Sequence, residues 1–226
     1  HRASYSCQIS RTIRYSSSTT KKMKYIYIIR TARVFSAIFR PYYMPVVGFI
    51  GLFSFTYLSL LPFNFKLFIL LAIYCFTILI PQICIFCYRK INGWAPHQIR
   101  IQANRTIPYA ISIISYVACL WLMYRMHLPR YMCGIIVAAL LIQASCATIN
   151  IWWKISTHSA GAGGIIGALL AYSTLFDFNP INWLCILILI SGVVGSSRML
   201  LRQHTLGQVI GGTLLGTVLG FIGIII

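Results

Sequence analysis

Long apolar runs, separated by short polar stretches, dominate the chain after residue 43. Each run is close to the length of roughly 17–25 residues that a helix needs to cross a bilayer. Because backbone N–H and C=O groups inside lipid must be satisfied within their own segment, we expect every run to be helical. The runs are placed at residues 44–62, 66–88, 108–126, 131–153, 159–176, 181–196 and 205–226.

This pattern predicts an all-α, polytopic membrane helix bundle with about six or seven transmembrane helices. Pro81 falls inside the second run, where we expect it to kink the helix. Small residues four positions apart let transmembrane helices approach closely, so the glycine-rich fifth and seventh runs should pack tightly. Their glycines are Gly161, Gly163, Gly164 and Gly167, and then Gly207, Gly211, Gly212, Gly216 and Gly220.

Composition agrees with a membrane protein, since 59% of the 226 residues are hydrophobic and 9% are charged. Soluble domains are nearer 45–50% apolar. Two regions are expected. Residues 1–43 form a basic, Ser- and Arg-rich N-terminal segment, disordered over 1–24 and helical at the membrane interface over 25–43. Residues 44–226 form the transmembrane domain.

The chain carries 19 Lys and Arg residues against a single acid, Asp177, which gives a formal net charge of +18. Basic loops beside anionic lipid explain this charge better than nucleic-acid binding does. One carboxylate cannot build a glycosidase-type pair or an ordinary magnesium site. Cys84 and Cys87 have no second Cys/His pair nearby, so no metal and no cofactor is expected.

Two polar islands interrupt the last third of the chain. The first polar island is 154–158, with Lys154, Ser156 and His158. The second polar island is 197–204, with Ser197, Arg198 and His204, and it is followed by Gln208. Two membrane crossings separate the islands and return the chain to the side that it left, so they are expected to meet at one membrane face.

The residue types in the islands indicate phosphate chemistry. A neutral imidazole at His204 can attack phosphorus and form a phosphohistidine, and His158 can protonate the leaving oxygen. Arg198 offers a planar fork of donors for phosphate oxygens. Lys154 and Ser156 beside a helix N-terminus add further donors, with no need for a metal.

The order of these residues resembles the type 2 phosphatidic acid phosphatase superfamily, and particularly membrane homologues of Bacteroidetes bacteria. Ser197, Arg198 and His204 match its third signature, Ser-Arg, five residues, His. The stretch 155–158 resembles its second signature, Pro-Ser-Gly-His, in the serine and the histidine. The resemblance implies His204 as nucleophile, His158 as acid, and Arg198 and Ser156 as phosphate ligands. It also implies lipid phosphates or polyprenyl pyrophosphates as substrates and a bacterial inner membrane as the location.

Three departures from the family pattern stand out. The family has Asp where this chain has Gln208, which can orient His204 but brings no charge. Ile155 and Thr157 replace the Pro and Gly of the second signature. The first signature, Lys, six residues, Arg-Pro, is not intact; its nearest candidate is the segment 100–108, in which Arg105 would bind phosphate.

Three functions remain open. The leading one is a lipid-phosphate phosphohydrolase. The second is a catalytically impaired relative that binds anionic headgroups or serves as a membrane partner subunit. The third is a small transporter, which would need a polar site at the bilayer midplane.

The membrane face that holds the islands is open too. All Lys and Arg except Lys66, Arg125 and Arg130 fall on the side of the islands, which favours the cytoplasmic face. Most members of the family that the chain resembles act on the outer face. The lipid and the oligomeric state also stay open.

Overall fold

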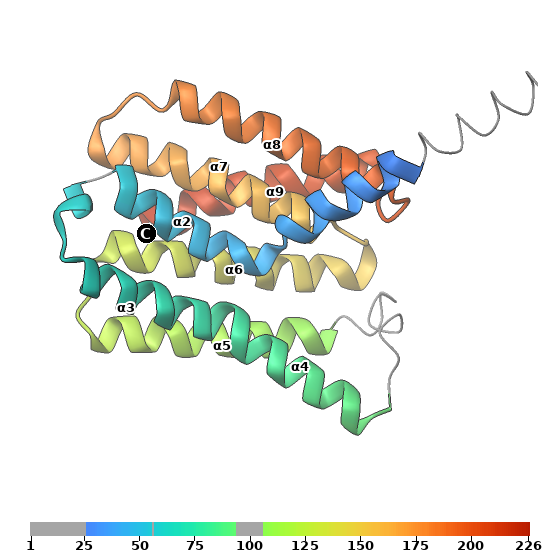
Figure 1. Cartoon of the computed structure of the whole chain (residues 1–226), viewed down its shortest axis with the longest axis horizontal. Helices are drawn as coiled ribbons and strands as arrows, with labels where there is room; N and C mark the ends of the chain where they lie inside the picture. Colours follow the sequence, from blue (N-terminus) through green and yellow to red (C-terminus); the bar gives the residue numbers. More distant parts are fainter. Residues whose placement is uncertain (1–25, 56, 94–105) are drawn as a thin grey trace, which may run out of the picture.

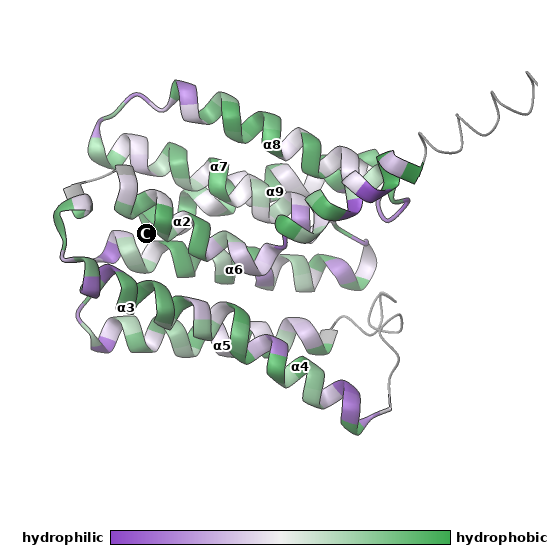
Figure 2. Cartoon of the chain, viewed as in Figure 1, coloured by the Kyte–Doolittle hydropathy of each residue, from purple (hydrophilic) through white to green (hydrophobic). Residues whose placement is uncertain are grey.

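The computed structural model describes residues 26–55, 57–93 and 106–226 of the chain. Its described part is a bundle of long helices with no strand, as the apolar runs predict (Figure 1). Seven helices in this part are long and apolar enough to cross a membrane. The protein is therefore an all-α, multi-pass membrane protein. Figure 2 shows that hydrophobic residues run along the helices, while hydrophilic ones concentrate at their ends.

A first helix covers residues 26–38 and has no label in Figure 1. The labelled α-helices then follow in chain order: α2 (Met44–Phe55), α3 (Phe63–Tyr74), α4 (Ile80–Ile91), α5 (Thr106–Arg125), α6 (Arg130–Trp152), α7 (Thr157–Phe176), α8 (Ile181–Leu200) and α9 (Leu206–Ile225). Two short 3₁₀ helices, η1 (Pro41–Tyr43) and η2 (Tyr57–Leu60), flank α2, and a π-helical turn, η3 (Cys75–Leu79), joins α3 to α4.

The N-terminal helix and α2 form one continuous candidate span, Ile26–Ser54, with a bend at Pro41. Proline lacks an amide N–H and is well placed at the first position of the new turn. The described part of the predicted N-terminal segment therefore leads directly into the bundle. The disorder predicted for residues 1–24 lies outside the described residues.

The interruption expected at Pro81 appears as the π-helical turn just before it. Proline cannot donate to the carbonyl four residues earlier, which disturbs the regular hydrogen-bond ladder. Ser115 on α5 donates a hydrogen bond to the Phe76 carbonyl within this turn. Thr77 donates to the Ile73 carbonyl at 2.8 Å. The Ser115 side chain thus gives a backbone carbonyl of the π turn a hydrogen-bond donor from a neighbouring helix.

The glycine-rich helices α7 and α9 pack backbone against backbone, as their glycine pattern predicts. A Cβ atom on Gly216 would lie 2.0 Å from the Ala160 carbonyl oxygen, and one on Gly167 would lie 2.0 Å from that of Thr217. Real Cβ atoms do not approach so closely, so only glycine fits there. We call this α7–α9 contact the seam. It fixes the starts of α7 and α9, which lie at the C-terminal ends of the two polar islands, at one height in the bundle.

Apolar side chains fill the other end and the middle of the bundle. The main cluster joins Phe49 of α2, Ile73 of α3, Tyr116 of α5, Ile136 of α6 and Tyr172 of α7. Tyr172 also donates a 2.6 Å hydrogen bond to the Tyr131 carbonyl. This end is packed and apolar, whereas the end at which α7 and α9 begin is polar.

Candidate functional site

The two polar islands meet, as expected, at the end of the bundle where α7 and α9 begin. The backbone N–H of Ser156 donates a 3.3 Å hydrogen bond to the Gln208 carbonyl, which joins the islands directly. His158 is the second residue of α7, and His204 stands two positions before α9. The His204 imidazole is close enough to His158 to act on it electrostatically.

Ser156 is the N-cap of α7 and is fully buried. Its hydroxyl accepts from the Ser159 backbone N–H at 3.4 Å and lies 2.9 Å from the Ser159 hydroxyl. A cap of this type satisfies one of the free amides at a helix start. The structure thus gives Ser156 a role in holding the first turn of α7, and with it the position of His158.

The turn after α8 places His204 through a residue in the left-handed conformation. Arg202 has φ 52°, and the N–H of Gln203 donates to the Arg198 carbonyl at 3.1 Å. This arrangement is a Schellman-type helix end, in which glycine is the usual left-handed residue. The chain therefore turns sharply after α8, so that Arg198 and His204 come from the two sides of one tight turn.

Gln208 determines which nitrogen of His204 carries the proton. The side-chain oxygen of Gln208 accepts from the Thr205 backbone N–H at 3.2 Å and lies 3.1 Å from His204 Nδ1. An oxygen that accepts from a backbone amide faces Nδ1 as an acceptor too, so Nδ1 carries the hydrogen. Nε2 then keeps its lone pair, which is the form that a nucleophilic imidazole needs.

Arg198 lies in the last turn of α8 and is 9% exposed. Its Nη1 donates a 2.6 Å hydrogen bond to the hydroxyl of Ser36, which belongs to the N-terminal helix and is also buried. The contact spans 162 positions in the sequence. It orients the guanidinium and ties the N-terminal helix to the site.

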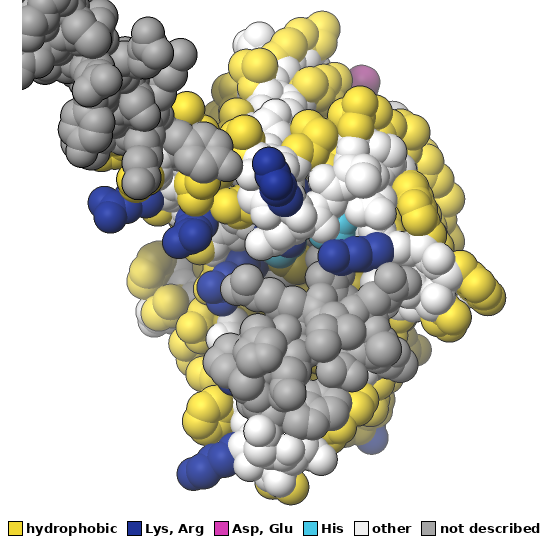
Figure 3. Space-filling model, turned by 90° about the vertical axis from the view of Figure 1, so that its right-hand side faces the viewer, with side chains coloured by type: hydrophobic (Ala, Val, Ile, Leu, Met, Phe, Trp, Pro, Cys, Tyr) yellow, Lys and Arg dark blue, Asp and Glu magenta, His cyan; other side chains and the backbone are white. Residues whose placement is uncertain are grey.

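A cavity of about 820 Å³ opens beside these residues. Five cationic side chains of the described residues line it, and they come from four different parts of the chain: Arg33, Arg40, Arg89, Lys154 and Arg198. Figure 3 shows this end of the molecule, with Lys and Arg side chains around a region where histidine atoms are visible. We call this space the cationic cavity.

No carboxylate side chain balances the cationic cavity. Asp177 is the one acid of the chain, and it is the C-cap at the far end of α7, while His158 lies at the start of that helix. The 20 residues of α7 correspond to about 30 Å. At that distance a carboxylate cannot offset five neighbouring cations, because charges beyond a Debye length of about 10 Å are largely screened. The cavity is therefore suited to an anion with several negative charges.

His158 lines the cationic cavity and is half-buried. Its Nδ1 atom is buried and has no hydrogen-bond partner among the described residues. Arg198 and Arg40 act on its charge from nearby, and the Ser36 backbone lies within hydrogen-bonding range of the ring. A bound anion would relieve the repulsion between these cations and a protonated His158.

The structure separates the expected site residues into three groups. Lys154, His158 and Arg198 line the cationic cavity. His204 and Gln208 are not among its lining residues, but His204 directly follows Gln203, which is, and Gln208 contacts His204. Ser156 and Ser197 do not line it: both are buried, and Ser197 donates to the Val193 carbonyl at 2.8 Å. Arg105 lies outside the described residues.

Four residues of the site were not expected from the sequence: Arg33, Ser36, Arg40 and Arg89. A signal for two of them exists. Arg33, six residues, Arg40 and Pro41 follow the spacing of the family's first signature if Arg is accepted in place of Lys. The structure brings all three to the cationic cavity. No local pattern distinguishes Ser36 or Arg89, because their role depends on contacts with distant segments.

Comparisons of the chain with models of known families, with curated proteins and with solved structures find no match.

Proposed function

We propose that this protein hydrolyses the phosphate ester or diphosphate of a membrane lipid through a phosphohistidine at His204. The observation that carries the proposal is the cationic cavity, which has five Lys and Arg side chains among the described residues and no nearby carboxylate. His158 lines it, and His204 lies close to His158. Such preorganised donors stabilise the charge that develops on transferred phosphoryl oxygens. The cavity lies at the polar end of a membrane bundle, where lipid headgroups reside.

The reaction would proceed in two displacements. Nε2 of His204 attacks phosphorus, and the bond from phosphorus to the lipid oxygen breaks while protonated His158 gives its proton to that oxygen. Water then attacks the phosphohistidine, His158 accepts a proton from the water, and the P–N bond breaks to release phosphate. Arg198, Arg40, Arg33 and Lys154 neutralise the phosphoryl oxygens in both steps. Arg33 and Arg40 are added to the phosphate-binding residues predicted from the sequence, among which Arg105 stays a prediction because it lies outside the described residues.

One feature favours a second candidate function, namely an anionic-headgroup binder without turnover. Gln208 provides a neutral dipole where the related family has a carboxylate, so the positive charge that forms on His204 during attack gains less stabilisation. The binding function needs the five cations and not the histidine pair. The bacterial inner membrane is proposed as the location on the sequence resemblance alone.

The two candidate functions are separated by phosphate release from purified protein in detergent. The substrates are phosphatidic acid, phosphatidylglycerol phosphate and a polyprenyl pyrophosphate, each with a chelator present. Hydrolysis predicts release that persists with chelator and falls by roughly 10⁴-fold or more in His204→Ala, the scale of nucleophile removal. The matched control is His127→Ala, because His127 follows the end of α5 that lies opposite the islands. Binding of these lipids without release would support the headgroup binder instead.

A further inference from the structure

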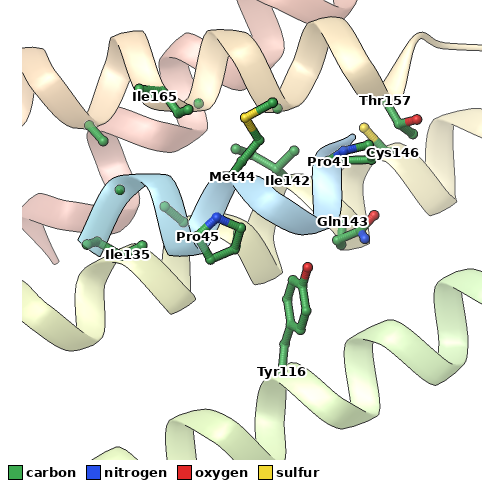
Figure 4. Close-up of a pocket in the computed structure, with 16 residues that line it drawn as sticks. Pro41, Met44, Pro45, Tyr116, Ile135, Ile142, Gln143, Cys146, Thr157 and Ile165 are labelled. Atoms are coloured by element: carbon green, nitrogen blue, oxygen red, sulfur yellow. The ribbon is translucent and has the colours of Figure 1, made fainter. Parts of the chain in front are cut away.

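A second cavity, smaller and apolar, continues from the cationic cavity into the bundle. It has a volume of about 60 Å³ and lies between α2, α6 and α7, with Tyr116 of α5 closing one side (Figure 4). Pro41, Gln143 and Thr157 line both cavities, so the two spaces adjoin. We call the smaller cavity the slot.

The slot has the proportions of a single extended chain. On α6 its lining runs from Cys146 to Ile135, and on α7 from Thr157 to Ala168. Eleven residues of helix correspond to about 16 Å on either side. One water molecule needs about 10–15 Å³ of such space, so a slot of about 60 Å³ over that length is narrow. It has room for part of one hydrocarbon chain and not for two side by side.

The chemistry of the lining changes at Gln143. Within the described part of the chain no Lys, Arg or His lines the slot, and most of its lining is formed by glycine, alanine, proline or apolar side chains. Tyr116 hydrogen-bonds with the Gln143 side chain, and both residues are buried. Figure 4 shows the Tyr116 hydroxyl pointing toward Gln143. Gln143 thus stands where a charged headgroup space gives way to an apolar one.

Small residues keep the slot open. Ala139 on α6 and Ala168 on α7 line it, and Gly48 on α2 and Gly161 on α7 face it. A Cβ on Gly161 would meet the Met44 side chain at 3.0 Å, and one on Gly48 would meet the Ile135 side chain at 3.3 Å. These neighbours are flexible side chains, in contrast to the backbone atoms that face the glycines of the seam.

We propose that the slot holds one hydrocarbon chain of the lipid whose phosphate occupies the cationic cavity. This inference rests on the proposed function. Because lipid tails are as apolar as the slot, moving a chain from the bilayer into it brings no hydrophobic gain. The slot instead fixes the position of the chain, and therefore of the phosphorus atom relative to His204, which is where accurate placement accelerates a reaction. The substrate class is a lipid phosphate or diphosphate with a single chain next to the phosphate-bearing end.

The test compares butyl phosphate with hexadecyl phosphate in detergent micelles. Ala139→Leu and Ala168→Leu each fill the slot. Ala110→Leu is the matched control, because Ala110 is exposed on α5 and lines neither cavity. Filling the slot is expected to lower kcat/KM for hexadecyl phosphate by about tenfold or more, the scale on which apolar pockets discriminate. Butyl phosphate has a chain too short to extend along the slot, so its kcat/KM should change by less than about twofold, as should that of both substrates in the control.

The outcomes separate this inference from the proposed function. If wild-type protein hydrolyses both phosphates but the slot variants affect them equally or not at all, the chain does not use the slot. If wild-type protein releases phosphate from neither, the proposed hydrolysis fails and the slot is judged by binding alone.

Photolabelling of wild-type protein tests whether the chain binds in the slot. It needs neither hydrolysis nor folded variants. The probe is hexadecyl phosphate with a diazirine near its chain end. Adducts on Ile135 or Ala168 support the slot. Adducts confined to outward-facing residues such as Ile188 and Leu189 of α8, both exposed, would overturn it.

Discussion

On the face of α7 that meets α9, a Cβ at Gly167 would lie 2.0 Å from a backbone oxygen, whereas on the face toward α2 a Cβ at Gly161 would lie 3.0 Å from the flexible Met44 side chain. The first face is the seam, where backbone atoms leave no room. The second face borders the slot, where side chains leave a cavity. Helix α7 therefore has a rigid side, which meets α9, and an adaptable side, which borders the slot. His158 lies in the first turn of this helix.

The two faces of α7 have different roles in the proposed function. The seam holds the two polar islands together, so that the His204 imidazole stays close to His158. The slot side can accommodate different chains without moving those groups. Changes on the seam side should therefore act on folding and on kcat for all substrates. Changes on the slot side should lower kcat/KM for long-chain substrates alone.

The largest effect is expected where the seam is broken. Gly216→Ala places a methyl group against the Ala160 carbonyl, so α7 and α9 must separate. Overpacking typically costs 1–3 kcal/mol, and here backbone must move, so we expect a loss of about 3 kcal/mol or more in the free energy of unfolding. Gly161→Ala, the same change on the slot side, should cost less than about 1 kcal/mol. Thermal unfolding in detergent compares the two, and equal destabilisation would remove the distinction between the faces.

Substitutions of Gln208, at the end of the seam, are expected to raise or lower kcat according to the residue introduced. Gln208→Glu keeps the side-chain length and both hydrogen-bond acceptor roles while adding a charge that stabilises the imidazolium. We expect kcat to rise by about tenfold, which corresponds to about 1.4 kcal/mol of transition-state stabilisation. Gln208→Met removes the acceptor and frees the tautomer, so kcat should fall by about 100-fold. This is less than the roughly 10⁴-fold lost when the charged orienting group of a Ser-His-Asp triad is replaced, because Gln208 brings no charge. An unchanged kcat in both variants would show that His204 does not act as a nucleophile oriented by Gln208.

A smaller effect is expected at Ser36, which orients Arg198 from the N-terminal helix. A hydrogen bond to a charged group contributes about 1.5–3 kcal/mol, part of which water can replace. Ser36→Ala should therefore lower kcat/KM by about tenfold for short- and long-chain phosphates alike. Ser54→Ala is the control, because Ser54 is exposed and donates only to the Ile50 carbonyl of its own helix. A selective loss on long chains would place Ser36 in chain binding instead.

The sequence predicted the fold and the meeting of the two islands because both follow from local features. Apolar runs of spanning length specify helices in lipid, and two crossings return the chain to one face. The glycines of α7 and α9 predicted the seam, because small residues four positions apart indicate that two transmembrane helices approach closely.

The rest of the site depends on distant contacts that local patterns do not encode. Ser36 reaches Arg198 across 162 positions, and Arg89 comes from the end of α4. The slot was not predictable either. Its lining comes from helices that are apolar on all sides, so hydrophobic periodicity does not indicate which face borders a cavity. Arg33 and Arg40 could have been found from the sequence, because their spacing matches the first signature. The match is not obvious, because Arg33 stands where the signature has Lys.

The most direct test of the central claim is to trap the covalent intermediate. Wild-type protein is mixed with a phosphate-labelled alkyl phosphate, quenched in alkali within one turnover, and mapped by peptide mass spectrometry. The account predicts an acid-labile phosphate on His204 that forms more slowly in His158→Ala, by roughly 10²–10⁴-fold for loss of a general acid. Phosphate release with no label on His204, or with label on another residue, would contradict it.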